Sequence, residues 1–214
     1  MRLFTSILFV IVIFSGQMTF AQAKKSSDDI LKEVSEKTKA FSSIQINFTY
    51  NMDNPTAKVH ESQTGTLLIK GDQYRLDISG QKVICDGKTV WTYIAESKEV
   101  QINAVDENEK VLTPTRLLTS YNKDYKSKLA GEVTKDGRAQ YVIDLKPNAD
   151  KSYTGVELNV DKELSRITRI AIQDKSGNTF SYSVNKFEPN VPASDADFVF
   201  NAKDYPGVEV IDMR

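Results

Sequence analysis

Apolar and polar residues alternate with a period of two along much of this chain, and the clearest run covers residues 44–52. Single polar residues there separate five apolar ones, namely Ile44, Ile46, Phe48, Tyr50 and Met52. Such alternation predicts a β-strand with one apolar face and one polar face. Further short strands are predicted at 64–70, 74–78, 83–85, 90–94, 100–102, 139–145, 156–160, 166–172 and 180–184.

The segment before the first strand follows a helical spacing instead. Ser26 or Ser27 offers an N-cap, and two acidic residues follow it, as the positive end of a helix dipole favours. Ile30, Leu31 and Val34 then fall on one face. This narrow apolar face predicts a helix that lies on another element.

A second helical segment, 113–121, interrupts the series of strands. It opens with a capping threonine and a proline at the first helical position. Leu117, Leu118 and Tyr121 would share one face. A short helix inserted between strands in this way is a candidate lid, with Leu117 and Leu118 as its apolar face.

Together these segments predict a mainly β (α+β) protein with about ten short antiparallel strands and a few helices. Turn residues such as Asp136-Gly137 separate the strands, and no internal repeat or flexible linker divides the chain. A sheet this wide usually curls or closes. If the apolar face points inward, the sheet encloses an apolar concavity whose mouth the helices can cover.

The first 21 residues are predicted to be a signal peptide that is absent from the folded domain. Arg2 precedes an apolar run at 3–14, and small residues follow before Ala21. Twelve residues of helix span about 18 Å, which is too short to cross a membrane. Cleavage after Ala21 or Ala23 would release one soluble, exported domain, residues 22–214, into the periplasm.

Composition and charge exclude several classes of protein. Of the 214 residues, 28 are Lys or Arg and 29 are Asp or Glu, which argues against a nucleic-acid partner. The chain has one Cys and one His, too few for a disulfide or a conventional zinc cluster. We therefore expect no metal and no other cofactor.

The residues that could carry catalysis lack a supporting motif. His60 lies in a polar stretch and is expected to be exposed, and Cys85 lies in a predicted strand and is expected to be a small buried apolar residue. There is no glycine-rich phosphate loop and no G-x-S-x-G motif. We expect no catalytic residues and no enzyme, although a secreted enzyme that uses His60 or Cys85 is an alternative.

Aromatic residues are the more informative group, because the chain contains nine Tyr and one Trp and several of them fall within predicted strands. They could fill an ordinary core, or they could line a cavity for an apolar ligand. Periodicity alone does not distinguish a filled interior from a hollow one. The predicted lining residues are Phe48, Tyr50, Tyr74, Leu76, Trp91 and Tyr93.

Several stretches of the chain resemble the periplasmic outer-membrane lipoprotein carrier family (LolA-type). The most specific is Asp86–Tyr93, which reads DGKTVWTY and is similar to the family's DGKTLWxY segment. Weaker similarities occur at 46–50, 65–70, 74–76, 196–200 and 206–212. Their order and spacing extend over essentially the whole chain after the signal peptide.

This resemblance implies an unclosed β-barrel of about eleven strands, with short α-helices as a lid over a hydrophobic cavity. It also implies a monomeric carrier that binds the acyl chains of lipoproteins. Such a carrier receives them from an inner-membrane ABC transporter and delivers them to an outer-membrane acceptor. The family's lid-latch arginine has no counterpart, because Lys70 is followed by Gly71 and Asp72. A lipid-sensing or regulatory binding module of the same fold is the alternative.

Overall fold

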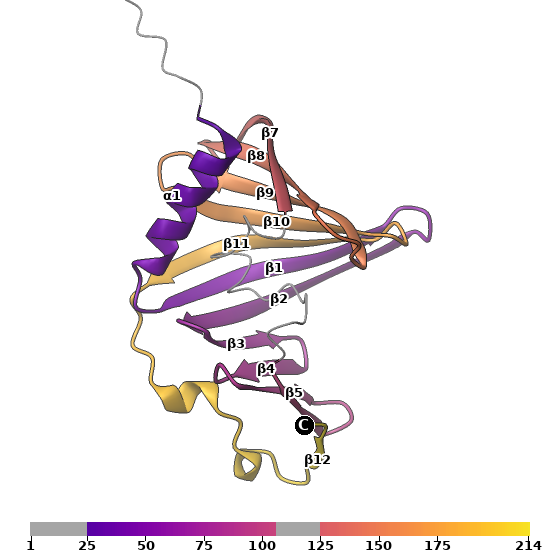
Figure 1. Cartoon of the computed structure of the whole chain (residues 1–214). Helices are drawn as coiled ribbons and strands as arrows, with labels where there is room; N and C mark the ends of the chain where they lie inside the picture. Colours follow the sequence, from indigo (N-terminus) through magenta and orange to yellow (C-terminus); the bar gives the residue numbers. More distant parts are fainter. Residues whose placement is uncertain (1–24, 106–124) are drawn as a thin grey trace, which may run out of the picture.

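Twelve strands form one continuous curved sheet in the computed structural model (Figure 1), which describes residues 25–105 and 125–214. The predicted signal peptide and the predicted helix 113–121, with Leu117 and Leu118, lie outside the described residues. The strand order is β12-β6-β5-β4-β3-β2-β1-β11-β10-β9-β8-β7. All neighbours are antiparallel except β12 and β6, and the two ends of this order are not paired, so the barrel is unclosed.

The elements of the first half of the chain are α1 (Ser27–Lys39), β1 (Ile44–Asn54), β2 (Val59–Lys70), β3 (Gln73–Ile78), β4 (Gln81–Cys85), β5 (Thr89–Ile94) and β6 (Glu99–Ala104). Those of the second half are β7 (Tyr125–Lys135), β8 (Arg138–Pro147), β9 (Tyr153–Asp161), β10 (Arg166–Asp174), β11 (Thr179–Pro189), η1 (Asp195–Phe198), η2 (Ala202–Asp204) and β12 (Glu209–Asp212).

The predicted mainly β fold with an open, curved sheet is confirmed, and so is the helix before the first strand. Strands β7 and β12 were not predicted. β7 carries Lys126, Lys128 and Lys135 and lies at one end of the sheet, where charged side chains are exposed and alternation is weak. β12 has four residues, which is too few to establish a period.

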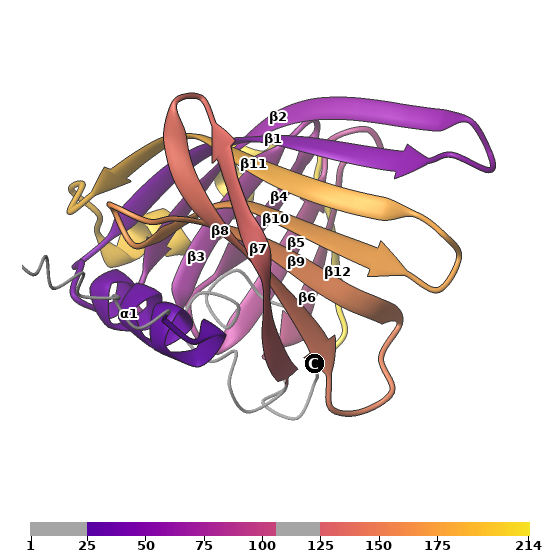
Figure 2. The same ribbon diagram turned by 90° about the horizontal axis from the view of Figure 1, so that it is seen from above.

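Helix α1 lies across one face of the sheet (Figures 1 and 2). Its start is specified by a capping box, in which the Ser26 hydroxyl accepts from the Asp29 amide and the Asp29 carboxylate bonds back to Ser26. Its buried residues pack on Leu158 and other apolar side chains of β8–β10. We call the face covered by α1 the inner face and the opposite one the outer face.

A C-terminal segment, residues 190–212, covers part of the outer face. The Asn190 amide donates to the Ser43 carbonyl at 2.7 Å, and Lys70 bonds Asp195 at 2.8 Å. Phe198 of η1 is completely buried, and η1 contacts β3. Farther along, Phe200 packs with Ile84, Val100 and their half-buried neighbours. Among the described helices, none has the length and apolar character that a membrane crossing requires.

Asp161, at the end of β9, is a buried carboxylate with a full set of partners. Its oxygens accept from the Glu163 amide at 3.0 Å, from the Leu164 amide at 2.8 Å, and from the guanidinium of Arg138. Burial acts to raise the pKa of Asp161, but these donors outweigh it and hold that pKa below its usual value. The charged carboxylate therefore stabilises the turn after β9.

Replacing Asp161 with Asn is expected to lower the free energy of unfolding at pH 7 by about 2 kcal/mol, because the charge-assisted bonds are lost. The native pKa is lower than the unfolded one, so this contribution is present above pH of about 4 and is lost as pH falls through the native pKa. Urea unfolding should show the difference between wild type and variant shrinking at acid pH. Asp150, whose side chain is 91% exposed, provides the control, and Asp150→Asn should change little. A difference that stays constant down to pH of about 2 would contradict this account.

Candidate functional site: an apolar inner face

The inner face of β1–β4 and β11 carries the largest group of aromatic and aliphatic side chains away from α1. Its buried members are Ile44, Ile46, Phe48, Leu67, Ile69, Tyr74 and Cys85. Around them lie half-buried apolar residues, namely Phe41, Tyr50, Leu76, Ile78, Val83, Val90, Tyr182, Val184 and Phe187. Because these surrounding residues are only partly covered, this inner-face surface is a candidate site for an apolar ligand.

Aromatic rings form a continuous row along β1 and β11. Tyr182 has its ring centroid 5.8 Å from Phe48 and 5.2 Å from Tyr50. Tyr50 in turn stacks on Phe180 with centroids 6.5 Å apart. These spacings suit attractive ring–ring contacts, which hold the row rigid.

Gly65 of β2 makes room for this row. It lies opposite Phe48 in the register of the sheet. A Cβ atom at Gly65 would stand 2.5 Å from Phe48 Cζ and 2.7 Å from the Asp77 carbonyl oxygen. The absence of a side chain at this position therefore lets the Phe48 ring lie close to the backbone of Gly65 on the neighbouring strand.

Three tyrosine hydroxyls on this face lie in a weakly solvated environment. Burial raises the pKa of Tyr74 to about 12, and burial also raises the pKa values of Tyr50 and Tyr182. The phenols therefore stay neutral throughout the physiological range. The surface they share is apolar, with a few neutral hydrogen-bonding groups.

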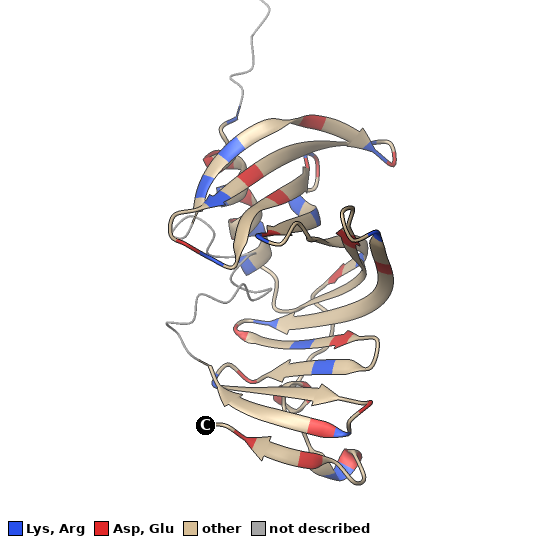
Figure 3. Cartoon of the chain, turned by 90° about the vertical axis from the view of Figure 1, so that its right-hand side faces the viewer, with Lys and Arg blue, Asp and Glu red and all other residues tan. Residues whose placement is uncertain are grey.

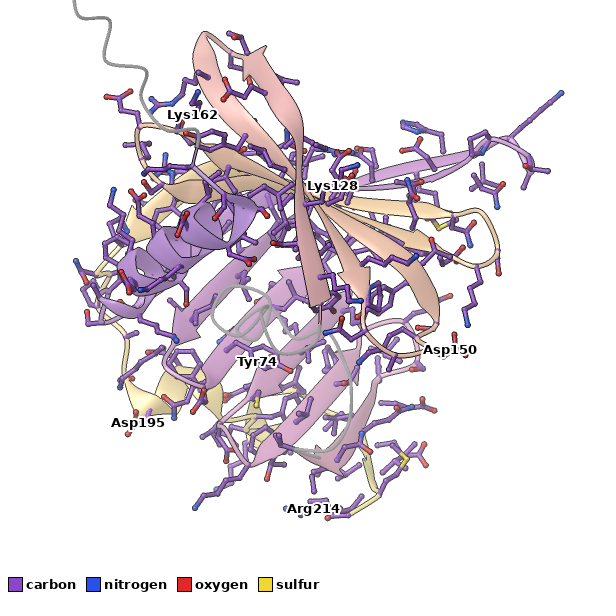
Figure 4. The ribbon with its side chains drawn as sticks, turned by 45° about the horizontal axis from the view of Figure 1, so that its top comes forward. Tyr74, Lys128, Asp150, Lys162, Asp195 and Arg214 are labelled. Carbon is purple, nitrogen blue, oxygen red and sulfur yellow. The ribbon has the colours of Figure 1, made fainter. Side chains whose placement is uncertain are left out.

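Four of the six predicted lining residues lie together on this face. Phe48 and Tyr50 alternate with polar residues of β1, and Tyr74 and Leu76 do the same on β3. In the register of the sheet, Tyr74 pairs with Cys85 and Leu76 with Val83, which places them on the same face. Figure 4 shows Tyr74 on the curved sheet, with Asp150, Asp195 and Arg214 toward the edges of the view.

Trp91 and Tyr93 lie on the outer face, which corrects the expectation that all six share one surface. Trp91 pairs with Ile84, and Tyr93 pairs with Lys82. The C-terminal segment covers them: Tyr93 has its ring centroid 4.5 Å from Tyr205 and 6.0 Å from Phe200. The physical reason is that β4 and β5 have apolar residues on both faces, so a second cluster forms on the outer side.

Sequence reasoning also missed the contribution of β11. Phe180, Tyr182 and Val184 pack on the inner face, and they alternate with Ser181 and Ser183. The signal was therefore present in the sequence as a strand with one apolar face. What was absent was the information that β11 pairs with β1, since 125 or more residues separate them along the chain.

The two residues considered for catalysis, His60 and Cys85, do not lie in surroundings that suit a catalytic role. His60 is exposed near the β1–β2 turn and lies 2.5 Å from Asp53. Cys85 is buried on the inner face, and burial raises the pKa of its thiol, which keeps it protonated and weakly nucleophilic. Within residues 25–105 and 125–214, no group of three or more His, Cys, Asp or Glu side chains could hold a metal ion.

A hollow of about 560 Å³ lies mainly on the outer side of β1–β5. Its lining includes the polar side chains of Asn47, Thr66 and Lys82. Lys82 is neutralised by Asp77 at 2.7 Å. The lining also includes Phe48, Ile78 and Tyr93, so this hollow is of mixed polar and apolar character. The inner face carries the larger apolar group and remains the candidate site for an apolar ligand.

Comparison with known proteins places this architecture in a family. The chain matches the family model described as outer membrane lipoprotein carrier protein LolA over residues 17–201. An uncharacterized conserved protein of Thermus thermophilus has a similar structure, with a TM-score of 0.60 and 14% sequence identity. That match covers 86% of this chain and 98% of the other, and it supports the fold.

Two further solved structures are similar at a lower level. A LolA superfamily protein of Nitrosomonas europaea gives a TM-score of 0.48 at 17% identity, covering 83% of this chain and 99% of that one. An outer membrane lipoprotein-sorting protein domain of Vibrio parahaemolyticus gives 0.44 at 11% identity, covering 78% and 95%. A search of curated protein sequences found no match.

Proposed function

The chain belongs to the outer membrane lipoprotein carrier protein LolA family, and on that premise we propose that it carries lipoproteins by holding their acyl chains against its inner face. The observation that supports this role most directly is the half-buried apolar surface of β1–β4 and β11. Phe48, Tyr50, Tyr74 and Leu76 are the proposed lining residues.

The driving force is the removal of hydrocarbon from water. Burying one CH₂ group contributes about 0.8 kcal/mol of binding free energy. An acyl chain has many such groups, so its burial against an apolar surface contributes many times that amount. The aromatic row of Phe48, Tyr50, Tyr182 and Phe180 offers a broad, rigid surface for such a chain. Binding of this kind requires burial alone and no bond-breaking step, so we propose a binding protein rather than an enzyme.

We place this activity in the periplasm. The signal peptide would direct export, and the mature chain would act as a monomer that passes between membranes. It would receive its cargo from an inner-membrane ABC lipoprotein transporter and release it to an outer-membrane acceptor. Both partners are proposed from the family to which the chain belongs.

Two measurements test the proposal. Native mass spectrometry of gently purified protein should reveal bound lipid or lipoprotein, and an acylated peptide should bind while the same peptide without its acyl chain does not. In the organism that produces it, depletion of this protein should leave lipoproteins at the inner membrane. If purified protein carries no acyl species and acylated peptides do not bind, the carrier role is wrong. If acyl ligands bind but lipoproteins keep their distribution, the protein is a lipid sensor instead.

A further inference from the structure

The inner face changes its chemical character at β6. Across β1, β3 and β11 the inner side chains are apolar, but on β6 they are Glu99, Gln101 and Asn103. The register fixes this assignment, because Gln101 pairs with Thr92 and Thr92 pairs with Val83 of the apolar group. The apolar residues of β6 face outward instead, where Val100 is completely buried beneath the C-terminal segment.

The β6 side chains form a polar end to the apolar surface. Glu99, Gln101 and Asn103 are each half-buried, so they are not freely solvated. In the described part of the chain, no side-chain hydrogen bond engages Gln101, Asn103 or Thr92. Their amide and hydroxyl groups are therefore available to a ligand.

Charge is also distributed unequally between the two faces. On β1–β6 and β11, the alternation of side chains along each strand places all the lysine and arginine residues on the outer face, namely Lys70, Arg75, Lys82 and Lys186. The inner face of the same strands carries two charged residues, Glu61 and Glu99, and both are acidic. Figure 3 shows that both signs are present along the chain as a whole, so this one-signed character belongs to the inner face of these strands. Arg166 of β10 lies over the Phe187 ring at 4.8 Å, on the side of the sheet away from β6.

We propose that the inner face binds acylated ligands in one orientation and selects those whose polar end is uncharged, an inference that rests on the proposed function. The hydrocarbon lies over β1–β3 and β11, and the amide or ester group next to it meets Gln101, Asn103 and Thr92. An amide-linked acyl chain, as at an acylated protein terminus, fits this surface. A free fatty acid or an anionic phospholipid is disfavoured.

The physical basis is the cost of a second negative charge beside Glu99. Two like charges a few ångströms apart in a partly desolvated site repel each other more strongly than in water. No inner-face cation on β1–β6 or β11 compensates an anionic headgroup. A neutral amide, in contrast, can both donate to and accept from the Gln101 and Asn103 side chains.

The test compares two ligands that differ in one group: myristoyl-glycine, which is anionic at neutral pH, and myristoyl-glycine amide, which is neutral. Calorimetry should show the wild-type protein binding the amide about tenfold more tightly. Glu99→Gln should narrow that preference. We define the ratio as the dissociation constant of myristoyl-glycine divided by that of myristoyl-glycine amide. Gln101→Lys should lower this ratio at least about tenfold relative to wild type, so that the two ligands bind equally or the anionic one binds more tightly.

Two matched variants separate this orientation from a general effect of charge. Gln63→Lys adds the same charge to the inner face far from β6, and Gln173→Lys adds it to the exposed outer side of β10. Neither should change the ratio by more than about twofold. Equal binding of both ligands by the wild type, or equal effects of all three lysine variants, would overturn the orientation while leaving the carrier role standing. Failure of the wild type to bind either ligand would overturn both.

Discussion

Replacing Phe198 with alanine is expected to lower the free energy of unfolding by about 4 kcal/mol. Phe198 is completely buried at the end of η1, where the C-terminal segment packs against the outer face at β3. Truncation leaves a cavity and removes one of the anchors that hold this segment across the sheet. Urea unfolding can be followed by the fluorescence of Trp91, which packs in the neighbouring outer-face cluster.

The adjacent residue provides a control for this measurement. Val199 is 49% exposed, so Val199→Ala should change the free energy of unfolding by less than about 0.5 kcal/mol. If Phe198→Ala were as mild as Val199→Ala, the C-terminal segment would not be an integral part of the fold. The coverage of Trp91 and Tyr93 would then need another explanation.

The second large effect is expected on ligand binding. Leu76→Asn should weaken the binding of an acylated peptide about thirtyfold or more, because it places an unpaired amide where the hydrocarbon chain would lie. Leu76 is half-buried on the inner face, beside Val83 of β4. The dissociation constant can be measured by displacement of a fluorescent fatty-acyl probe.

Leu68 allows the same substitution to be made on the other face. It is half-buried on β2, pairs with Arg75, and lines a small outer hollow. Leu68→Asn should cost a similar amount of folding free energy while leaving the dissociation constant within about twofold of wild type. If both variants weakened binding equally, the loss would reflect general destabilisation, and the inner face would not be the binding surface.

The local periodicity of the sequence was sufficient for most of the secondary structure. The alternation of Ile44, Ile46 and Phe48 predicted a strand with one apolar face, and these residues are buried on one side of β1. The capping residues before Ile30 predicted helix α1. The predicted Asp136-Gly137 turn likewise lies between β7 and β8. In each case, the signal is contained within a few neighbouring residues.

The candidate site was less accessible to the same reasoning. Phe48 and Tyr74 occupy the inner face as expected, but their neighbour Tyr182 comes from β11, which is far away along the chain. Long-range strand pairing brings these rings together, and no local period encodes which strands become neighbours. The row of aromatic residues is therefore a property of the assembled sheet.

Trp91 and Tyr93 show most directly where sequence reasoning ends. By itself, the sequence determined that β5 is a strand and that both aromatic residues share one of its faces, because a strand's side chains alternate with a period of two. Only the tertiary structure decided that this face is the outer one. An apolar face must be covered, but the covering residues Phe200 and Tyr205 come from a segment more than a hundred residues away along the chain. Local alternation therefore specifies that two faces exist, and the packing of distant segments decides which of them is left for a ligand.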